Sequence, residues 1–221
     1  ISEHLERGAN IPVFNNHGLG AAIPVLAALI NSMKIVGKDL LQSRVVINGA
    51  GMAGLATADL LIKAGIKQVV VCDGDGALYK YRPRAMSWAK WDIVKKTNPE
   101  NFTGTLDGAL KGADVVSGLS AEGAMKADMI RQMAKDPVIL AMATPTPEIM
   151  PEEARQAGVR VMAFNRADVP NQTDVAMVFP GFFRAILGSR ASNINDTMAL
   201  AAAQALADCV SVDELAPDYV M

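Results

Sequence analysis

The sequence predicts an α/β fold, a doubly wound parallel sheet of the Rossmann-like, dinucleotide-binding kind. From Arg44 onward, short apolar runs alternate with helical stretches, a pattern typical of a parallel sheet with helices on both faces. The first apolar run leads into a G-x-G-x-x-G turn formed by Gly49, Gly51 and Gly54. The second ends on a carboxylate, Asp73, at the place where such folds bind a nucleotide ribose.

Five segments have the apolar, β-branched character of strands that are buried on both faces. They are RVVINGA (44–50), QVVVCD (68–73), ADVVSGL (113–119), PVILAMA (137–143) and VRVMAF (159–164). Between them, GLATADLLIKAG (54–65) ends in a lysine and a glycine, and PEEARQAG (151–158) starts with proline and two glutamates. These residues are typical of the two ends of a helix.

One helix is expected on each side of this alternating region. The first runs over about residues 20–33, where Pro24 is tolerable only near the first turn. The second is an Ala-rich segment within 192–210, with Ser192 or Asn195 as its N-cap. Because no internal repeat, low-complexity segment or linker composition interrupts the chain, we expect residues 1–221 to form a single domain.

Composition narrows the classes of partner. The chain is 51% hydrophobic and carries a net charge of −2, so it has no basic field for nucleic acid or anionic membranes, and we expect neither partner. The uncharged run from Gly8 to Ser32 has a continuous apolar part shorter than the ~20 residues of a membrane span. Cys72 and Cys209 are the only cysteines and have no zinc or disulfide spacing, which fits a reducing cytoplasm.

The glycine turn has the context that phosphate binding requires, because it lies between a strand and a helix. Gly49 allows the tight turn, Gly51 lets the backbone approach a pyrophosphate, and Gly54 lets the helix lie close to the sheet. The free N–H groups and positive dipole end of the helix then face the phosphates. The alternative is a tight strand–helix turn without a ligand.

Asp73 is placed to accept hydrogen bonds from the adenosine ribose, and Asp75 follows two residues later. Two carboxylates with no arginine beside them would repel the extra phosphate of NADP, so NAD is the expected cofactor. Alternatively, Asp73 merely starts the turn DGDG.

Further strand ends point to the same crevice. Ser120 and Thr144 each follow a predicted strand, although serine and proline-rich segments also simply form loops. The expected cofactor-binding residues are Gly49, Gly51, Met52, Ala53, Gly54, Leu55, Asp73, Ser120, Ala121 and Thr144.

The chain resembles the cofactor domain of malic enzymes, which oxidise and decarboxylate malate to pyruvate with NAD or NADP and a divalent metal. The resemblance covers nearly all 221 residues. It rests on IPVF before a helix with LAAL, INGAGMAGLA, VCDGDGALY, TNPENFTGTLDGALKGADV, KDPVILAMATPTPEIMPEEA, VPNQ and VFPGFFRAIL. It implies hydride transfer to the nicotinamide and a metal, Mg or Mn, that polarises the forming carbonyl.

Several residues differ from the family pattern at positions that bind the metal, the cofactor or the substrate. His17 stands where the family has a metal-binding aspartate, and Asn16 stands where it has the preceding aspartate. Thr144 replaces an asparagine that faces cofactor and substrate. Asp174 and Val175 replace two asparagines, the second of which holds the substrate carboxylate.

These departures leave several roles open. Asn16, Asp174 and Val175 are the candidate catalytic positions, and His17 is the candidate metal ligand. A lone histidine at a helix entrance is more often a capping or packing residue, since Mg and Mn prefer carboxylates. Asn15 and Asn16 are also good N-terminal capping residues.

The family's catalytic tyrosine and lysine and its other metal carboxylates precede IPVF, where this chain has only ten residues, so that catalytic segment is expected to be missing here. The opening residues ISEHLERGA resemble the tail of a longer chain. The expected function is NAD-dependent oxidation of malate or a close 2-hydroxy acid, in a homo-oligomer or with a second chain that carries the missing half. The alternatives are a non-catalytic NAD-binding partner and an oxidoreductase of the same ancestry with another substrate.

Overall fold

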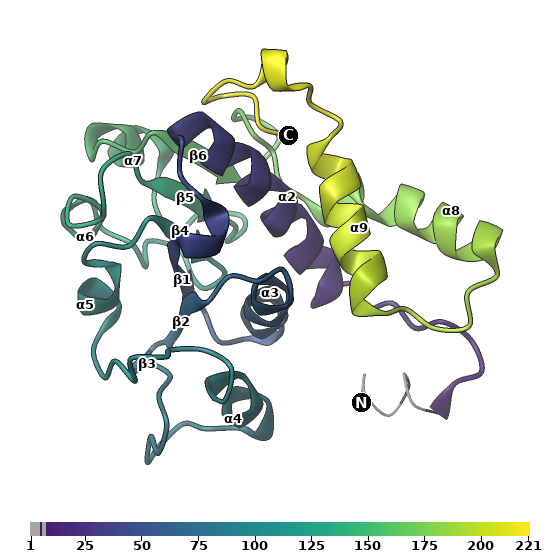
Figure 1. The fold of residues 1–221 in the computed structure, drawn as a ribbon. Helices are drawn as coiled ribbons and strands as arrows, with labels where there is room; N and C mark the ends of the chain where they lie inside the picture. Colours follow the sequence, from purple (N-terminus) through teal and green to yellow (C-terminus); the bar gives the residue numbers. More distant parts are fainter. Residues whose placement is uncertain (1–4, 6–7) are drawn as a thin grey trace.

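The computed structural model describes Leu5 and residues 8–221, which form a six-stranded sheet with helices on both faces (Figure 1). The strand order is β3-β2-β1-β4-β5-β6. All neighbouring strands are parallel except β2 and β3. The strands are β1 (Arg44–Asn48), β2 (Gln68–Asp73), β3 (Gly76–Ala77), β4 (Val115–Gly118), β5 (Val138–Ala141) and β6 (Val161–Phe164). The expected doubly wound parallel sheet is therefore confirmed.

The strands are apolar along their whole length because both faces of the sheet are covered. In β1, Val45 and Ile47 belong to the core on one face, whereas Val46 belongs to the core on the other. Successive side chains of a strand point to opposite faces. A strand buried on both faces therefore has a continuous apolar sequence instead of an alternating one.

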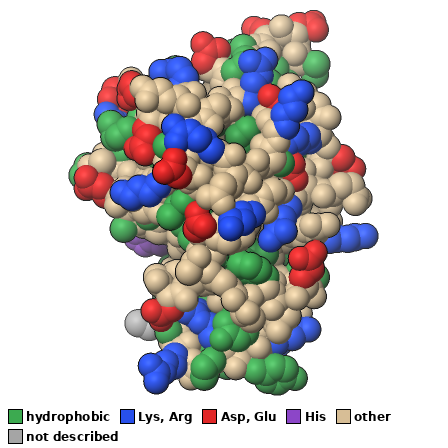
Figure 2. Space-filling view, turned by 90° about the vertical axis from the view of Figure 1, so that its left-hand side faces the viewer, with side chains coloured by type: hydrophobic (Ala, Val, Ile, Leu, Met, Phe, Trp, Pro, Cys, Tyr) green, Lys and Arg blue, Asp and Glu red, His purple; other side chains and the backbone are tan. Residues whose placement is uncertain are grey.

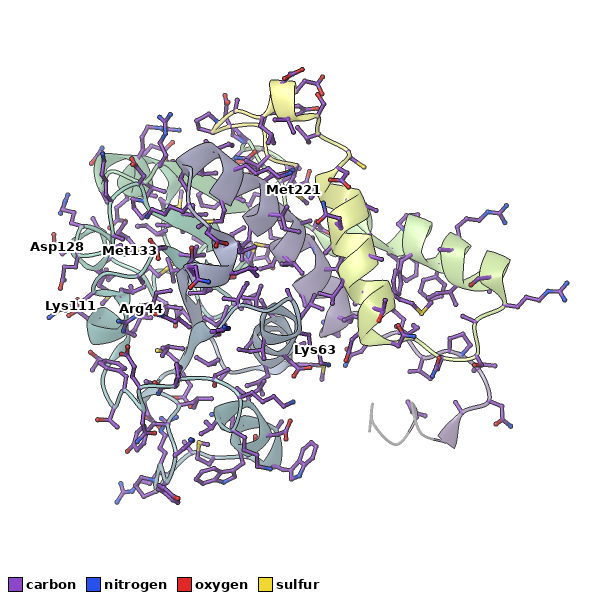
Figure 3. The ribbon with its side chains drawn as sticks, in the orientation of Figure 1. Arg44, Lys63, Lys111, Asp128, Met133 and Met221 are labelled. Carbon is purple, nitrogen blue, oxygen red and sulfur yellow. The ribbon has the colours of Figure 1, made fainter. Side chains whose placement is uncertain are left out.

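Three helices cover one face, namely α2 (Leu19–Val36), α3 (Met52–Lys63) and α9 (Asp196–Ala207) (Figure 1). Lys63 points from α3 toward the start of α9 (Figure 3), where its ammonium lies 2.7 Å from the Asp196 carboxylate. Asn195 caps α9 by accepting the Met198 N–H, which resolves the choice between Ser192 and Asn195.

The helix α2 departs from the expected bounds. It contains Pro24 at its sixth position, beyond the first turn, and continues to Val36, where Gly37 ends it in the left-handed conformation at φ 65°. Proline in a helix interior removes one hydrogen bond, but Ile23, Pro24 and Val25 are all buried, so packing outweighs that loss. By length and composition α2 could cross a membrane, yet 67% of it is buried inside the chain.

The opposite face carries α5 (Leu106–Leu110), α6 (Ala127–Ile130) and α7 (Pro151–Gln156) (Figure 1). Pro151 begins α7, as expected. Lys and Arg side chains are interspersed with Asp and Glu on the face of the molecule that Figure 2 shows, and no field of one sign forms there.

Like α5 and α6, two further helices have no counterpart among the predicted elements. The helix α4 (Trp88–Val94) lies beyond the β3 edge, and α8 (Phe179–Ser189) lies beyond α9, away from the sheet (Figure 1). Phe14 packs against α8 through Phe179, Phe182 and Phe183, at ring-centroid distances of 5.2–6.1 Å. Short 3-10 turns occupy Leu40–Gln42, Val175–Met177 and Val212–Glu214.

Candidate functional site

A crevice of about 880 Å³ opens at the carboxyl ends of β1, β2 and β4. The neighbours of β1 are β2 on one side and β4 on the other, so the chain reverses its direction across the sheet here, and ligands of such folds bind at this kind of position. The size also suits a cofactor. The crevice is lined by Asn48, Gly49, Ala50, Gly51, Asp73, Gly74, Asp75, Gly76, Lys90, Thr105, Leu106, Asp107, Ser120, Ala121, Ala124 and Met129.

The glycine turn is shaped by two close backbone approaches. Gly49 has φ +127°, and a Cβ there would lie 2.1 Å from the Leu119 carbonyl oxygen. A Cβ on Gly54 would lie 1.7 Å from the Gly49 carbonyl oxygen. Neither contact is possible for a residue with a side chain, so Gly49 lets the turn pass close to the segment after β4, and Gly54 lets α3 lie against the end of β1.

Gly51 differs from the other two because a Cβ on it would meet nothing within 4 Å. It is the N-cap of α3 and its position carries no side-chain cap. The first N–H groups of α3 and its positive dipole end therefore face open space beside Gly51. This arrangement fits a phosphate group, which would approach the backbone at the position where a side chain is absent.

Asp73 lies at the end of β2, and two cations hold its carboxylate. Arg82 donates to both oxygens, at 2.8 and 2.7 Å, and the Lys90 ammonium donates to Oδ2 at 2.6 Å. Arg82 is 5% exposed and the Asp73 side chain 12%. The expectation that no arginine lies beside the two carboxylates is therefore wrong. The loop after β3 folds back and brings Arg82 to Asp73 from nine residues downstream.

The cations also change the acidity of Asp73. Burial alone would raise the pKa of this carboxyl, but the hydrogen bonds from Arg82 and Lys90 outweigh it and lower the pKa to about 2. Asp75 adds a more distant contact with Arg82, at 3.6 Å. Asp73 is therefore ionised at neutral pH, and its charge is already balanced before any ligand arrives.

The end of β4 is tied to β1 by a hydrogen bond between two side chains. The Asn48 amide donates to the Ser120 hydroxyl at 2.9 Å, and both residues line the crevice. Beneath them, the buried Glu148 carboxylate accepts hydrogen bonds from the backbone N–H groups of Ser120 and Ala143.

The polar turn before α2 lies against the 3-10 turn that contains Val175. A Cβ on Gly20 would lie 2.7 Å from a Val175 methyl group and 3.1 Å from the Asn16 side-chain oxygen, so the structure brings Asn16 and Val175 to the same glycine. Asp174 uses its carboxylate to cap that 3-10 turn by accepting the Ala176 N–H at 2.7 Å.

The described residues before α2 do not assemble a metal site by themselves. His17 is exposed in the turn, and within Leu5 and residues 8–221 no three His, Cys, Asp or Glu side chains come together in a way that could hold an ion. Mg and Mn prefer several oxygen ligands. The helix entrance itself is organised by Asn15, whose side chain accepts the Gly18 N–H at 2.9 Å.

The predicted cofactor residues divide into those that line the crevice and those that do not. Gly49, Gly51, Asp73, Ser120 and Ala121 line it. Gly54 is buried under the turn, Leu55 packs against the core, and Thr144 is exposed outside the lining. Met52 and Ala53 form the first turn of α3 next to the crevice, and Met52 is 54% exposed.

Sequence reasoning missed four residues, namely Asn48, Arg82, Lys90 and Glu148. The first directly precedes Gly49 and could have been found from its place at the end of a strand. The others had no comparable signal, because they reach the site from a loop, from α4 and from the segment before α7.

Comparison with known proteins gives a consistent result. The family profile described as "Malic enzyme, NAD binding domain" matches residues 19–221. The bifunctional malic/malolactic enzyme of Bacillus subtilis is 46% identical over 221 residues, which cover 100% of this chain and 54% of the relative. The NAD-dependent malic enzyme of Geobacillus stearothermophilus is 42% identical over 222 residues, which cover 100% of this chain and 46% of the relative.

A solved structure agrees with the sequence relatives. The crystal structure of Entamoeba histolytica malic enzyme superposes with a TM-score of 0.94 at 36% identity, covering 100% of this chain and 47% of that chain. The chain thus spans about half the length of these two curated relatives.

Proposed function

The chain belongs to the malic enzyme family, and we propose on that premise that it is the NAD-binding part of an oxidoreductase that takes a hydride from malate or a close 2-hydroxy acid. The observation that carries the proposal is the Gly49–Gly54 turn, which opens α3 into the crevice at the reversal point of the sheet. Calorimetric titration with NAD tests it, and absence of binding would contradict it.

The crevice residues suit the successive parts of the dinucleotide. The pyrophosphate would lie at Gly51 and the first N–H groups of α3. The adenosine ribose would lie at the end of β2, beside Asp73 and Lys90. The nicotinamide would then extend past Ser120 toward the ends of β4 and β5. When bound, the cofactor supplies hydride acceptance at its nicotinamide ring.

The cations at Asp73 reduce the repulsion that the two carboxylates would exert on the extra phosphate of NADP. The Asp73 carboxylate is neutralised by Arg82 and Lys90, so a ribose 2′-phosphate would meet a charge-balanced carboxylate with the Lys90 ammonium beside it in the crevice. We propose that NAD is the cofactor and that its advantage over NADP is smaller than the two carboxylates alone would give.

The substrate is proposed from the activities named for the relatives. The substitutions at the family's substrate-binding positions bear on whether malate itself is bound. Val175 lies at Gly20, where the family has a carboxylate-binding asparagine, and an apolar side chain cannot hydrogen-bond a carboxylate. We propose oxidative decarboxylation of malate to pyruvate as the leading activity. There are two alternatives: an oxidoreductase that acts on a different 2-hydroxy acid, and a non-catalytic NAD-binding paralogue. Val175 supports either alternative, because the family's malate site has an asparagine at this position.

The reaction itself is proposed to need groups from outside the described residues. The described chain offers no metal set, and the family's tyrosine and lysine precede the matching segment. We therefore propose a homo-oligomer or a second chain that completes the site, in a reducing cytoplasm. Steady-state assay of the 221-residue chain with malate, NAD and Mn should show no pyruvate, and turnover by this chain would contradict the proposal.

A further inference from the structure

A carboxylate is buried under the ends of two neighbouring strands. Glu148 is 0% exposed. Its Oε1 accepts the Ser120 N–H at 2.9 Å, and its Oε2 accepts the Ala143 N–H at 3.0 Å. Ser120 follows β4 and lines the crevice, and Ala143 follows β5. One side chain therefore holds two loops that the sequence separates by more than twenty residues.

The fold leaves room for this carboxylate at a glycine. A Cβ on Gly118, the last residue of β4, would lie 2.5 Å from the Glu148 carboxyl carbon. The Glu148 backbone adds a further tie, because its carbonyl accepts the Met125 N–H at 3.0 Å. The segment that carries Ser120 and Ala121 is thus attached to the segment around Glu148 at both of its ends.

The geometry requires a carboxylate in particular. Two N–H donors approach from two loops, so the side chain between them needs two acceptor oxygens, and an amide offers one acceptor and one donor. The choice is costly, since burial raises the pKa of the Glu148 carboxyl and the surrounding backbone N–H groups, those of Ser120 and Ala143 foremost, offset this only in part. Among the described residues, no lysine or arginine forms an ion pair with it.

We propose that Glu148 is a positioning residue that holds the Ser120 and Ala143 loops in the arrangement that receives the nicotinamide half of the cofactor. This rests on the proposed function. The adenosine and pyrophosphate half lies at β2 and the glycine turn, which Glu148 does not touch. Loss of the carboxylate should therefore affect one half of the dinucleotide and spare the other.

Glu148→Gln tests the inference in the 221-residue chain. One loop loses its acceptor and faces an N–H donor instead, so NAD should bind about tenfold more weakly. ADP lacks the nicotinamide half, so the variant should bind ADP with an affinity within about twofold of the wild-type affinity. A difference of that size is usual for a substitution that does not disturb the site. A change confined to packing or stability would not separate the two ligands.

Glu153→Gln is the matched control. Its Oε1 accepts one backbone N–H, from Ala127 at 3.1 Å, and neither Glu153 nor Ala127 lines the crevice. It should bind both ligands like the wild type. If Glu148→Gln binds NAD as tightly as Glu153→Gln does, or loses NAD and ADP equally, the inference is wrong.

Gly118→Ala provides a second variant, should Glu148→Gln fail to fold. It keeps both acceptor oxygens but pushes the carboxyl group away from the end of β4, and the same loss of NAD with retained ADP is expected. Equal affinities in this variant and the wild type would overturn the inference. Failure of the wild-type chain to bind either NAD or ADP would instead reject the proposed function, and the inference with it.

Discussion

The Arg82 guanidinium makes a two-point contact with the Asp73 carboxylate, donating to Oδ2 at 2.8 Å and to Oδ1 at 2.7 Å. Lys90 approaches the same carboxylate from α4, at 2.6 Å. The residue that would select the ribose of the cofactor is thus held by two cations before any ligand binds. We therefore expect both cofactor choice and acid stability to depend on this contact.

Replacing Lys90 should lower affinity for NADP more than for NAD. Lys90→Gln removes an ammonium from the crevice beside the ribose site, and a 2′-phosphate would lose a charge-assisted hydrogen bond, so NADP should bind about tenfold more weakly. Calorimetric titration with both nucleotides measures the ratio. The control is Lys95→Gln, an exposed change at the C-cap of the same helix, where the ammonium makes one long contact with Asp92 at 3.8 Å. Equal ratios in the two variants would contradict the prediction.

Removing the charge of Asp73 should destabilise the fold. Asp73→Asn leaves Arg82, which is 5% exposed, without its carboxylate partner, and breaking a buried pair from one side costs about 3 kcal/mol. Urea unfolding of variant and wild type measures the difference. A variant as stable as the wild type would show that the contact contributes nothing in solution.

The same carboxylate should contribute a defined acid dependence. Its pKa is lowered to about 2 in the folded chain, against about 3.9 when unfolded. A depressed pKa gives stability that is present above the unfolded value and is lost as the pH falls through the folded value. Asp73 should therefore contribute roughly 2 kcal/mol above about pH 4, declining toward pH 2. The difference in unfolding free energy between wild type and Asp73→Asn, followed across this window, should shrink; a constant difference would refute the assignment.

Substitutions at two glycines of the glycine turn should have different effects, one on NAD binding and the other on stability. Gly51→Ala adds a methyl group in open space and should change stability by no more than about 1 kcal/mol, while weakening NAD about tenfold by blocking the backbone. Gly54→Ala places its Cβ 1.7 Å from the Gly49 carbonyl oxygen and should destabilise the fold by about 3 kcal/mol or more. Thermal unfolding and NAD titration of both variants check this, and tight NAD binding by Gly51→Ala would exclude the turn as the pyrophosphate site.

The two cysteines should differ in reactivity. Burial raises the pKa of the Cys72 thiol to about 12, and the thiolate is the reactive form, whereas Cys209 is exposed. A thiol reagent at pH 8 should label the native chain once, at Cys209, and label Cys72 only after denaturation. Peptide mapping by mass spectrometry locates the label, and rapid modification of Cys72 in the native chain would show that β2 opens.

The strands and the glycine turn could be predicted from the sequence because their causes are local. Runs such as Val45–Ile47 are apolar on both faces, and the spacing of Gly49, Gly51 and Gly54 is set by a turn of six residues. Helix ends were less certain. The sequence predicted a helix over about residues 20–33, whereas α2 runs from Leu19 to Val36 and ends at Gly37 in the left-handed conformation.

What only the tertiary structure decided is the charge and hydrogen bonding of the crevice. By itself, the sequence determined that a dinucleotide-type turn exists and that Asp73 ends the next strand. It did not determine that Arg82 and Lys90 fold back onto Asp73, that Glu148 reaches under β4 and β5, or that Asn16 meets Val175 at Gly20. These contacts join segments through loops whose paths depend on how the whole core packs, and no local periodicity or propensity encodes them.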